Sequence, residues 1–233
     1  MSKKMSSGLS LARRIAREVQ DLTGYLIEEG FSQDQNYPVV AQRGKDAFVV
    51  SFSNTVSFAP MLRDRPYPEM YREVLDLRAF NILMVDGAML QLTYSFDSGV
   101  LQQSRLGFLP SPSLLDYQNN PELYEEDVLY ADVIDRKAVS VPFRFDYDPR
   151  PGVASSLLHP VSHLTLGQYT NCRIATTAPV TPYYFVEFVL RSFYNTAMRQ
   201  VAAGLPRGSY QLAKCITAEE EGLIHVGVPF AAS

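Results

Sequence analysis

Apolar side chains recur at helical spacing near the N-terminus. Five of them lie three or four positions apart and would form one stripe on an α-helix: Leu11, Ile15, Val19, Leu22 and Leu26. Ser10 is a suitable N-cap, and Gly30 stands where glycine commonly ends a helix. The pattern predicts an amphipathic N-terminal helix that packs this stripe against the rest of the protein.

The pattern then changes to the alternation of β-strands. Apolar and polar residues alternate over residues 88–96, and the turn residues Asp97, Ser98 and Gly99 separate this run from a second strand over residues 100–109. The two runs predict a hairpin. Further strands are predicted over residues 47–52, 139–147, 163–167, 172–176 and 224–228.

A second helix is predicted over residues 182–203. Thr181 and Pro182 provide an N-cap and a first helical residue, and Gly204 and Pro206 end the apolar periodicity. A helix, a run of strands and a second helix define an α+β pattern. We therefore expect a single α+β domain over residues 1–233, in which a curved, mainly antiparallel sheet packs against the N-terminal amphipathic helix and a buried C-terminal helix.

Composition narrows the class of protein. The 233 residues are 46% hydrophobic and 20% charged, which is enough apolar material for a core, and the net charge of -4 excludes a wholly basic nucleic-acid coat. The charge is uneven: residues 1–20 hold five basic residues and one acidic residue, whereas residues 116–135 hold seven acidic residues and no basic one. These segments are either solvated faces or surfaces that bind a partner.

The chain has two cysteines, Cys172 and Cys215, and no continuous stretch of about 20 apolar residues that could cross a bilayer. Arginines interrupt the apolar positions near the N-terminus, which argues against a secretory signal. We expect a soluble, cytoplasmic protein with reduced cysteines that does not bind to a membrane.

One strand carries a candidate site. In residues 143–148, alternation places Phe143, Phe145 and Tyr147 on one face and the charged residues Arg144, Asp146 and Asp148 on the other. Charged groups beside a loop rich in proline and glycine are typical of functional sites, although a solvent-facing ladder of ion pairs would give the same pattern.

His159 and His163 follow, with Pro160 between them. On an extended strand their side chains would lie roughly 13 Å apart, too far to share a metal ion, so they converge only if the intervening residues form a turn. Metal binding, proton transfer, contact with phosphate and structural hydrogen bonding all stay open. Asp135, Arg136 and Lys137 also fit half of a nuclease-type metal site, although that spacing is expected by chance in a chain of this composition.

Several segments together resemble the bacterial protein family known as domain of unknown function 2290. They are residues 85–91, 104–112, 129–132, 144–148, 159–174 and 188–194, and the most specific is the His-Pro-Val-Ser-His-Leu-Thr-Leu-Gly stretch of residues 159–167. The resemblance spans about residues 80–200. It implies a bacterial cytoplasmic domain and no established activity, substrate or cofactor; a link to mobile elements or phage defence is a hypothesis about where such proteins are encoded.

These observations define a candidate polar site and three functions. Asp146, Asp148, His159 and His163 are the candidate catalytic residues, and Arg105, Arg144 and Arg173 the candidate phosphate-binding residues. The first hypothesis is a binding or accessory component that contacts nucleic acid or a nucleotide-handling partner. The second is a metal-dependent nuclease or phosphoesterase that uses Asp146, Asp148 and His163. The third is a structural protein–protein interaction module. Cofactors, metals and the oligomeric state stay open.

Overall fold

The computed structural model describes residues 2–52, 65–113, 141–167 and 172–231. The helices are α1 (Ser2–Glu28), α2 (Tyr67–Asp76), α5 (Pro182–Phe193), α6 (Asn195–Val201), the 3-10 helix η2 (Ala202–Gly204) and α7 (Ala218–Glu221). The strands are β1 (Ser32–Gln35), β2 (Val39–Gln42), β3 (Ala47–Ser51), β4 (Ile82–Met84), β5 (Met89–Asp97), β6 (Val100–Leu109), β7 (Phe143–Tyr147), β8 (Ser162–Leu166) and β9 (Arg173–Ala175).

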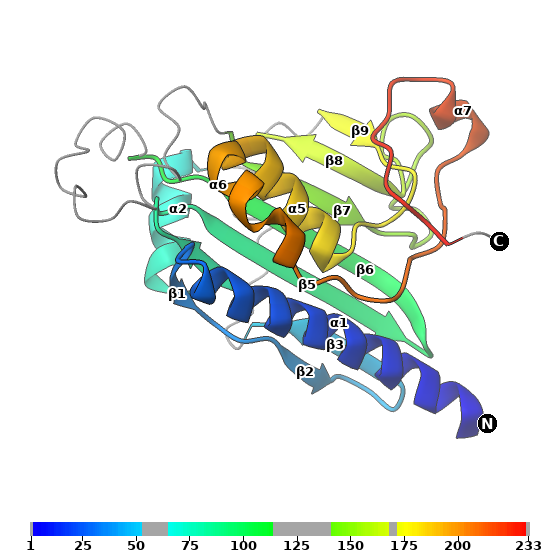
Figure 1. The fold of residues 1–233 in the computed structure, drawn as a ribbon. Helices are drawn as coiled ribbons and strands as arrows, with labels where there is room; N and C mark the ends of the chain where they lie inside the picture. The colour runs from blue at the N-terminus through cyan, green and yellow to red at the C-terminus, as the bar shows by residue number, and fades with distance from the viewer. Residues whose placement is uncertain (1, 53–64, 114–140, 168–171, 232–233) are drawn as a thin grey trace, which may run out of the picture.

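The strands form one open nine-stranded sheet in which every pair is antiparallel. Its order is β1-β4-β5-β6-β7-β8-β9, and the β2–β3 hairpin pairs with the far half of β5. The helices α1, α5 and α6 cover one face of the sheet, and α2 lies behind its opposite face (Figure 1). The α+β class and the antiparallel sheet predicted from the sequence are confirmed.

The long hairpin of β5 and β6 is the centre of the sheet. Ser98 and Gly99 form its two-residue turn with positive φ angles of 50° and 83°, the backbone geometry that twisted hairpins favour. Alternate side chains of β5, such as Leu90 and Leu92, enter the main core beneath α1. The predicted hairpin is therefore confirmed. The apolar residues of the alternating pattern in β5 are the ones that face the helices.

The predicted N-terminal stripe packs against the sheet. Ile15, Val19, Leu22 and Leu26 are buried, and Leu11 is partly buried against the same core. Gly30 ends the helix with φ 74°, and the amide groups of Gly30 and Phe31 donate to Ile27 and Leu26. The helix nevertheless begins at Ser2 rather than at Ser10, so Ser10 lies within the helix and is not its N-cap.

The second predicted helix is divided in two. Thr181 caps α5 by accepting a hydrogen bond from the Tyr184 amide, and Pro182 follows as predicted. At Tyr194 the backbone leaves helical geometry, with φ -128° and ψ 43°, and α6 then begins. The buried hydroxyl of Tyr194 donates to Asp86 at 2.8 Å, so this residue is fixed by a partner outside the helix.

Some short elements differ from the sequence prediction. The strands β1, β2 and β4 and the helix α2 were not predicted from the sequence. The predicted strand over residues 224–228 is wrong: Val226 makes only a single parallel bridge to Thr176. Of the predicted strand over residues 139–147, β7 covers Phe143–Tyr147, and residues 139 and 140 lie outside the described ranges. None of the described helices is both long and apolar enough to cross a bilayer.

We predict that Phe108→Ala lowers the free energy of unfolding by about 3–5 kcal/mol, as expected when a buried phenyl ring is removed from a packed core. Phe108 is 1% exposed and its ring centroid lies 4.8 Å from that of Phe193 and 5.2 Å from that of Phe143. Urea unfolding of both proteins measures the difference. Val100→Ala, at an exposed position of the same strand, is the control, and an equal loss in both variants would contradict the assigned core.

Candidate functional site

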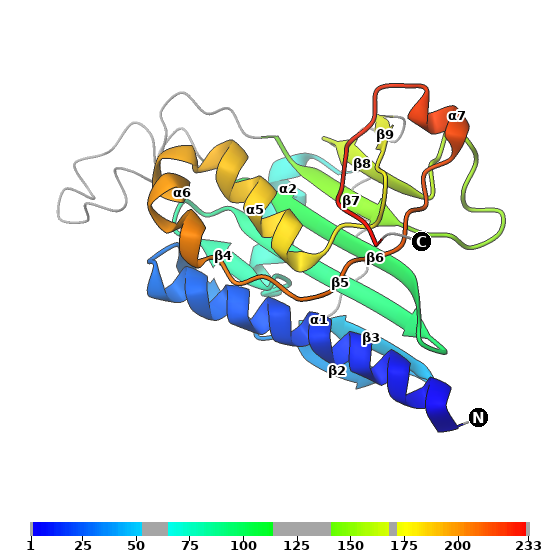
Figure 2. The ribbon, with the colours of Figure 1, turned by 45° about the vertical axis from the view of Figure 1, so that its right-hand side comes forward.

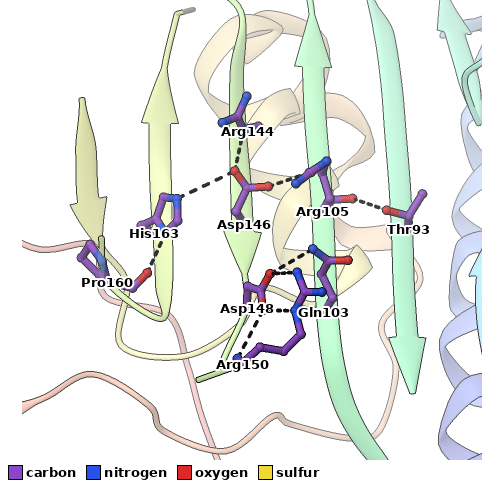
Figure 3. A network of polar contacts seen from close by, with 9 residues as sticks. All are labelled: Thr93, Gln103, Arg105, Arg144, Asp146, Asp148, Arg150, Pro160 and His163. Carbon is purple, nitrogen blue, oxygen red and sulfur yellow. Dashed lines mark hydrogen bonds and ion pairs between the residues drawn. The ribbon is translucent and has the colours of Figure 1, made fainter. Parts of the chain in front are cut away.

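The outer face of the sheet, the face opposite α1 and α5, carries most of the polar residues singled out in the sequence. Phe143 and Phe145 pack against Phe185 and Phe188 of α5, so the residues between them point to the other side. Strand register places Arg105, Asp146 and His163 in one row and Arg144, Thr165 and Arg173 in the next. Figure 3 shows the first row side by side on β6, β7 and β8.

Two arginines share one carboxylate at the centre of this face. Arg105 donates through Nε to Oδ1 of Asp146 at 2.8 Å, and Arg144 donates through its own Nε to Oδ2 (Figure 3). The side chain of Asp146 is 10% exposed, against 24% for Arg105 and 17% for Arg144. We call these three residues the Asp146 cluster. It carries one net positive charge and is partly open to solvent.

The cluster is held together electrostatically. Burial alone would raise the pKa of Asp146, but the guanidinium groups of Arg144 and Arg105 outweigh it and hold that pKa below its ordinary value. Asp146 is therefore ionised at neutral pH. Its two oxygens fix the orientation of both arginine side chains, because each bond is charge-assisted.

Both arginines bind Asp146 through Nε. Among the described residues, no acceptor pairs with the terminal nitrogens of Arg105 or Arg144. Beside them lies a small hollow of about 20 Å³. Its lining combines the polar or small residues Arg105, Arg144, Gly107 and Gln91 with the apolar residues Phe108, Leu109, Pro142 and Phe143. The hollow exists because Gly107, which pairs with Arg144 on one side and Gln91 on the other, has no side chain. Two oriented guanidinium groups beside a hollow of this size can bind the oxygen of an anion.

His163 is neutral and buried at the edge of the cluster. Its Nδ1 lies 2.8 Å from the carbonyl oxygen of Pro160, which can only accept, so Nδ1 carries the proton. Burial lowers the pKa of His163 to about 4, against the opposing effect of Asp146. Its Nε2 lies 3.8 Å from Oδ2 of Asp146, which is too long for a hydrogen bond, and the neutral ring forms no ion pair at pH 7.

The side chains of His159 and His163 lie close together. The sequence predicts this only if the residues between them form a turn. Their ring centroids are 5.0 Å apart, and between them the chain bends at Val161 just before β8 begins. Burial and the charge of Arg173 lower the pKa of His159. Arg173 itself lies on β9, where its Nη1 donates to the carbonyl of Leu158 at 3.5 Å. Its register position places it on the same face of the sheet as the Asp146 cluster.

Asp148 belongs to a separate pair. It follows β7 and accepts from Arg150 Nε at 2.8 Å and from Gln103 at 3.2 Å (Figure 3). Burial raises the pKa of Asp148, but the hydrogen bonds from Arg150 outweigh this effect. The pKa of Asp148 therefore lies below its ordinary value. The structure thus brings Arg105, Arg144, Asp146 and His163 together and leaves Asp148 and Arg173 at the margins. The catalytic and phosphate-binding roles assigned to them stay predictions.

The sequence prediction of a metal site has little geometric support. The described residues contain no group of three or more histidine, cysteine, aspartate or glutamate side chains that could hold a metal ion. Asp146 is already bonded to two guanidinium groups, which would have to be displaced before it could coordinate a cation. The nuclease-like residues Asp135, Arg136 and Lys137 and the acidic segment 116–135 lie outside the described ranges.

Three neighbours of the site were not singled out in the sequence. Gly107 and Gln91 line the hollow, and Thr165 pairs with Arg144 in the next strand. The hydroxyl oxygen of Thr165 is buried and has no hydrogen-bond partner within the described ranges. The alternation of the strand over residues 100–109 would have placed Gly107 beside Arg105, and this was the available signal.

The fold and this cluster define an α+β protein with a partly buried, positively charged site on an antiparallel sheet. The chain belongs to the family of uncharacterized conserved proteins named DUF2290, which matches residues 31–228. This match confirms the resemblance found over residues 80–200 and extends it at both ends. Neither the curated proteins nor the solved structures searched contain a match. The comparisons give no support to a link with mobile elements or phage defence.

The neutral state of His163 predicts a pH dependence of stability. Its pKa of about 4 in the folded protein lies below the ordinary value of 6.5, so the unfolded chain binds the proton more readily. The free energy of unfolding should therefore fall by up to about 3 kcal/mol as the pH drops from 6.5 to 4. Urea unfolding at several pH values measures this loss.

The loss should shrink in His163→Asn, whose amide can still donate to Pro160 but does not titrate. His225→Asn is the control, since His225 lies on the C-terminal segment and bonds only to the nearby carbonyl of Leu223 among the described residues. An unchanged loss in His163→Asn would show that another group causes the pH dependence.

Proposed function

We propose that the protein is a cytoplasmic, single-domain binding or accessory component that contacts the phosphates of nucleic acid through the Asp146 cluster. This proposal rests on the arrangement of Arg105 and Arg144. Each is fixed through Nε on the same buried carboxylate, and the terminal nitrogens of both pair with no acceptor in the described ranges. Arginine held in this way binds phosphate with little loss of side-chain entropy.

The shape of the site favours a polymer over a small ligand. A hollow of about 20 Å³ has room for roughly one water-sized group, such as a phosphate oxygen, and cannot enclose a nucleotide. A nucleic-acid backbone needs no enclosure, since it presents its phosphate oxygens on the outside and binds mainly through them. Arg173, two strands from Arg144 in the same register row, extends the positive charge of this face.

An enzymatic role for the same residues finds less support. His163 is 2% exposed and uses its one N–H on Pro160, so it is poorly placed to exchange a proton with a ligand at the surface. Asp146 holds arginines rather than an empty coordination position. The nuclease or phosphoesterase and the protein–protein interaction module therefore stay as the alternatives.

We predict that the wild-type protein binds a fluorescein-labelled 20-nucleotide single-stranded DNA and that Arg144→Gln weakens this binding about tenfold or more at 0.1 M salt, because charge-assisted bonds to a phosphate are lost. The slope of log K against log salt should become smaller by about one. Fluorescence anisotropy measures both quantities. Circular dichroism and thermal unfolding establish that the variant is folded.

Two further variants separate binding from folding. Gly107→Ala removes no charge and occupies part of the hollow: a Cβ at position 107 meets its nearest neighbour, Gln91 Oε1, at 3.4 Å, so we expect a folded protein with weakened binding. Arg199→Gln, an exposed arginine of α6 on the opposite face, should change the affinity less than twofold. No DNA binding by the wild type, or full affinity in folded Arg144→Gln and Gly107→Ala, would refute the proposal.

A further inference from the structure

A larger groove lies on the other side of the sheet, between α1 and the segment of residues 206–210. This segment follows η2 and runs alongside α1 in both overall views (Figures 1 and 2). The groove has a volume of about 660 Å³. Its charged lining consists of four arginines and two carboxylates: Arg13, Arg14, Arg17, Arg207, Glu18 and Asp21.

The arginines of the groove differ in how they are held. Arg14 donates to the carbonyl of Ser209 at 2.9 Å and lies over the ring of Tyr210, 5.1 Å from its centroid. Arg207 is fixed by a hydrogen bond to the hydroxyl of Tyr184. Arg17 pairs with Asp21 at the exposed rim, whereas the guanidinium group of Arg13 pairs with no acceptor among the described residues. The groove therefore presents an excess of positive charge to an incoming ligand.

The far wall of the groove is attached to α1 by a buried carboxylate. Glu18 is 5% exposed and accepts from the amide of Gly208 at 2.7 Å and from the hydroxyl of Tyr210. Gly208 approaches so closely that a Cβ there would stand 2.8 Å from Glu18 Oε1 and 2.6 Å from the ring of Tyr210. The wall that carries Arg207 and Tyr210 is thus held in a fixed position, as a binding site requires.

We propose that this groove binds a phosphate-bearing small molecule of the size of a nucleotide. Its volume lies within the range of about 300–1,000 Å³ that is typical of small-molecule sites. Leu9, Pro206 and the aliphatic stems of the arginines give it apolar walls for an organic group, and the guanidinium groups complement phosphate. The inference is independent of the proposed function, because the groove and the Asp146 cluster lie on opposite faces of the sheet.

Isothermal titration calorimetry with ATP, AMP, adenosine and inorganic pyrophosphate tests this inference. We expect ATP to bind more tightly than AMP and adenosine to bind at least tenfold more weakly than AMP, because the charge of the phosphates matches the arginines. Arg13→Gln should weaken ATP binding about tenfold, since one guanidinium group that faces the ligand is lost. Arg144→Gln, on the sheet face, should leave ATP binding unchanged while weakening DNA binding.

A pair of glycine variants tests the wall without changing any charge. Gly208→Ala forces the segment away from Glu18 and should weaken ATP binding several-fold, whereas Gly227→Ala, where a Cβ meets nothing within 4 Å, should leave it unchanged. Thermal unfolding checks that both variants are folded. Absence of ATP binding at millimolar concentration, or wild-type affinity in Arg13→Gln, would overturn the proposal. Pyrophosphate binding as tight as ATP binding would also overturn it, by showing a site for bare anions.

Discussion

Side chains alternate between the two faces of β6 and β7, and this constraint joins the core to the candidate site. Phe108 and Phe143 face the helices and stack on Phe193, so the residues next to them have to face the other way. A shift of one residue in the pairing of these strands would move the aromatic side chains to the outer face and the arginines into the core. The packing of the aromatic residues against α5 therefore also fixes where Arg144 and Asp146 lie.

The charge of Asp146 on the outer face needs compensation because this residue is buried. Asp146 is 8% exposed, and an unpaired carboxylate at that depth would be strongly destabilising. Arg105 and Arg144 supply the compensation from two neighbouring strands, which is possible because register sets Arg105 directly opposite Asp146. The carboxylate acts as a positioning group: it holds two cations whose terminal nitrogens pair with no acceptor in the described ranges. Under the proposed function, the same ion pairs that stabilise the fold would also orient the ligand-binding groups.

The sequence predicted the N-terminal helix, the central hairpin and the face of β7, but it missed β1, β2, β4 and α2 and did not predict the division between α5 and α6. The N-terminal stripe and the hairpin of β5 and β6 repeat their pattern over nine or more residues, whereas β4 spans only three. Seven residues were predicted to share one polar site, and the structure brings four of them together: Arg105, Arg144, Asp146 and His163. The hollow at Gly107 was missed because it depends on residues of three strands, and its position follows from register, which no local pattern contains.

The two arginine-rich regions on opposite faces of the sheet share one physical design and differ in shape. In each, a buried carboxylate fixes its surroundings: Asp146 orients Arg105 and Arg144 directly, whereas Glu18 fixes the backbone that carries Arg207. Arginines restrained by internal bonds lose less entropy when a ligand binds than free surface arginines do. The hollow of about 20 Å³ has room only for a protruding oxygen, whereas the groove of about 660 Å³ has room for a whole small molecule. This difference in volume, rather than the charge that both regions share, is why we propose different ligands for them.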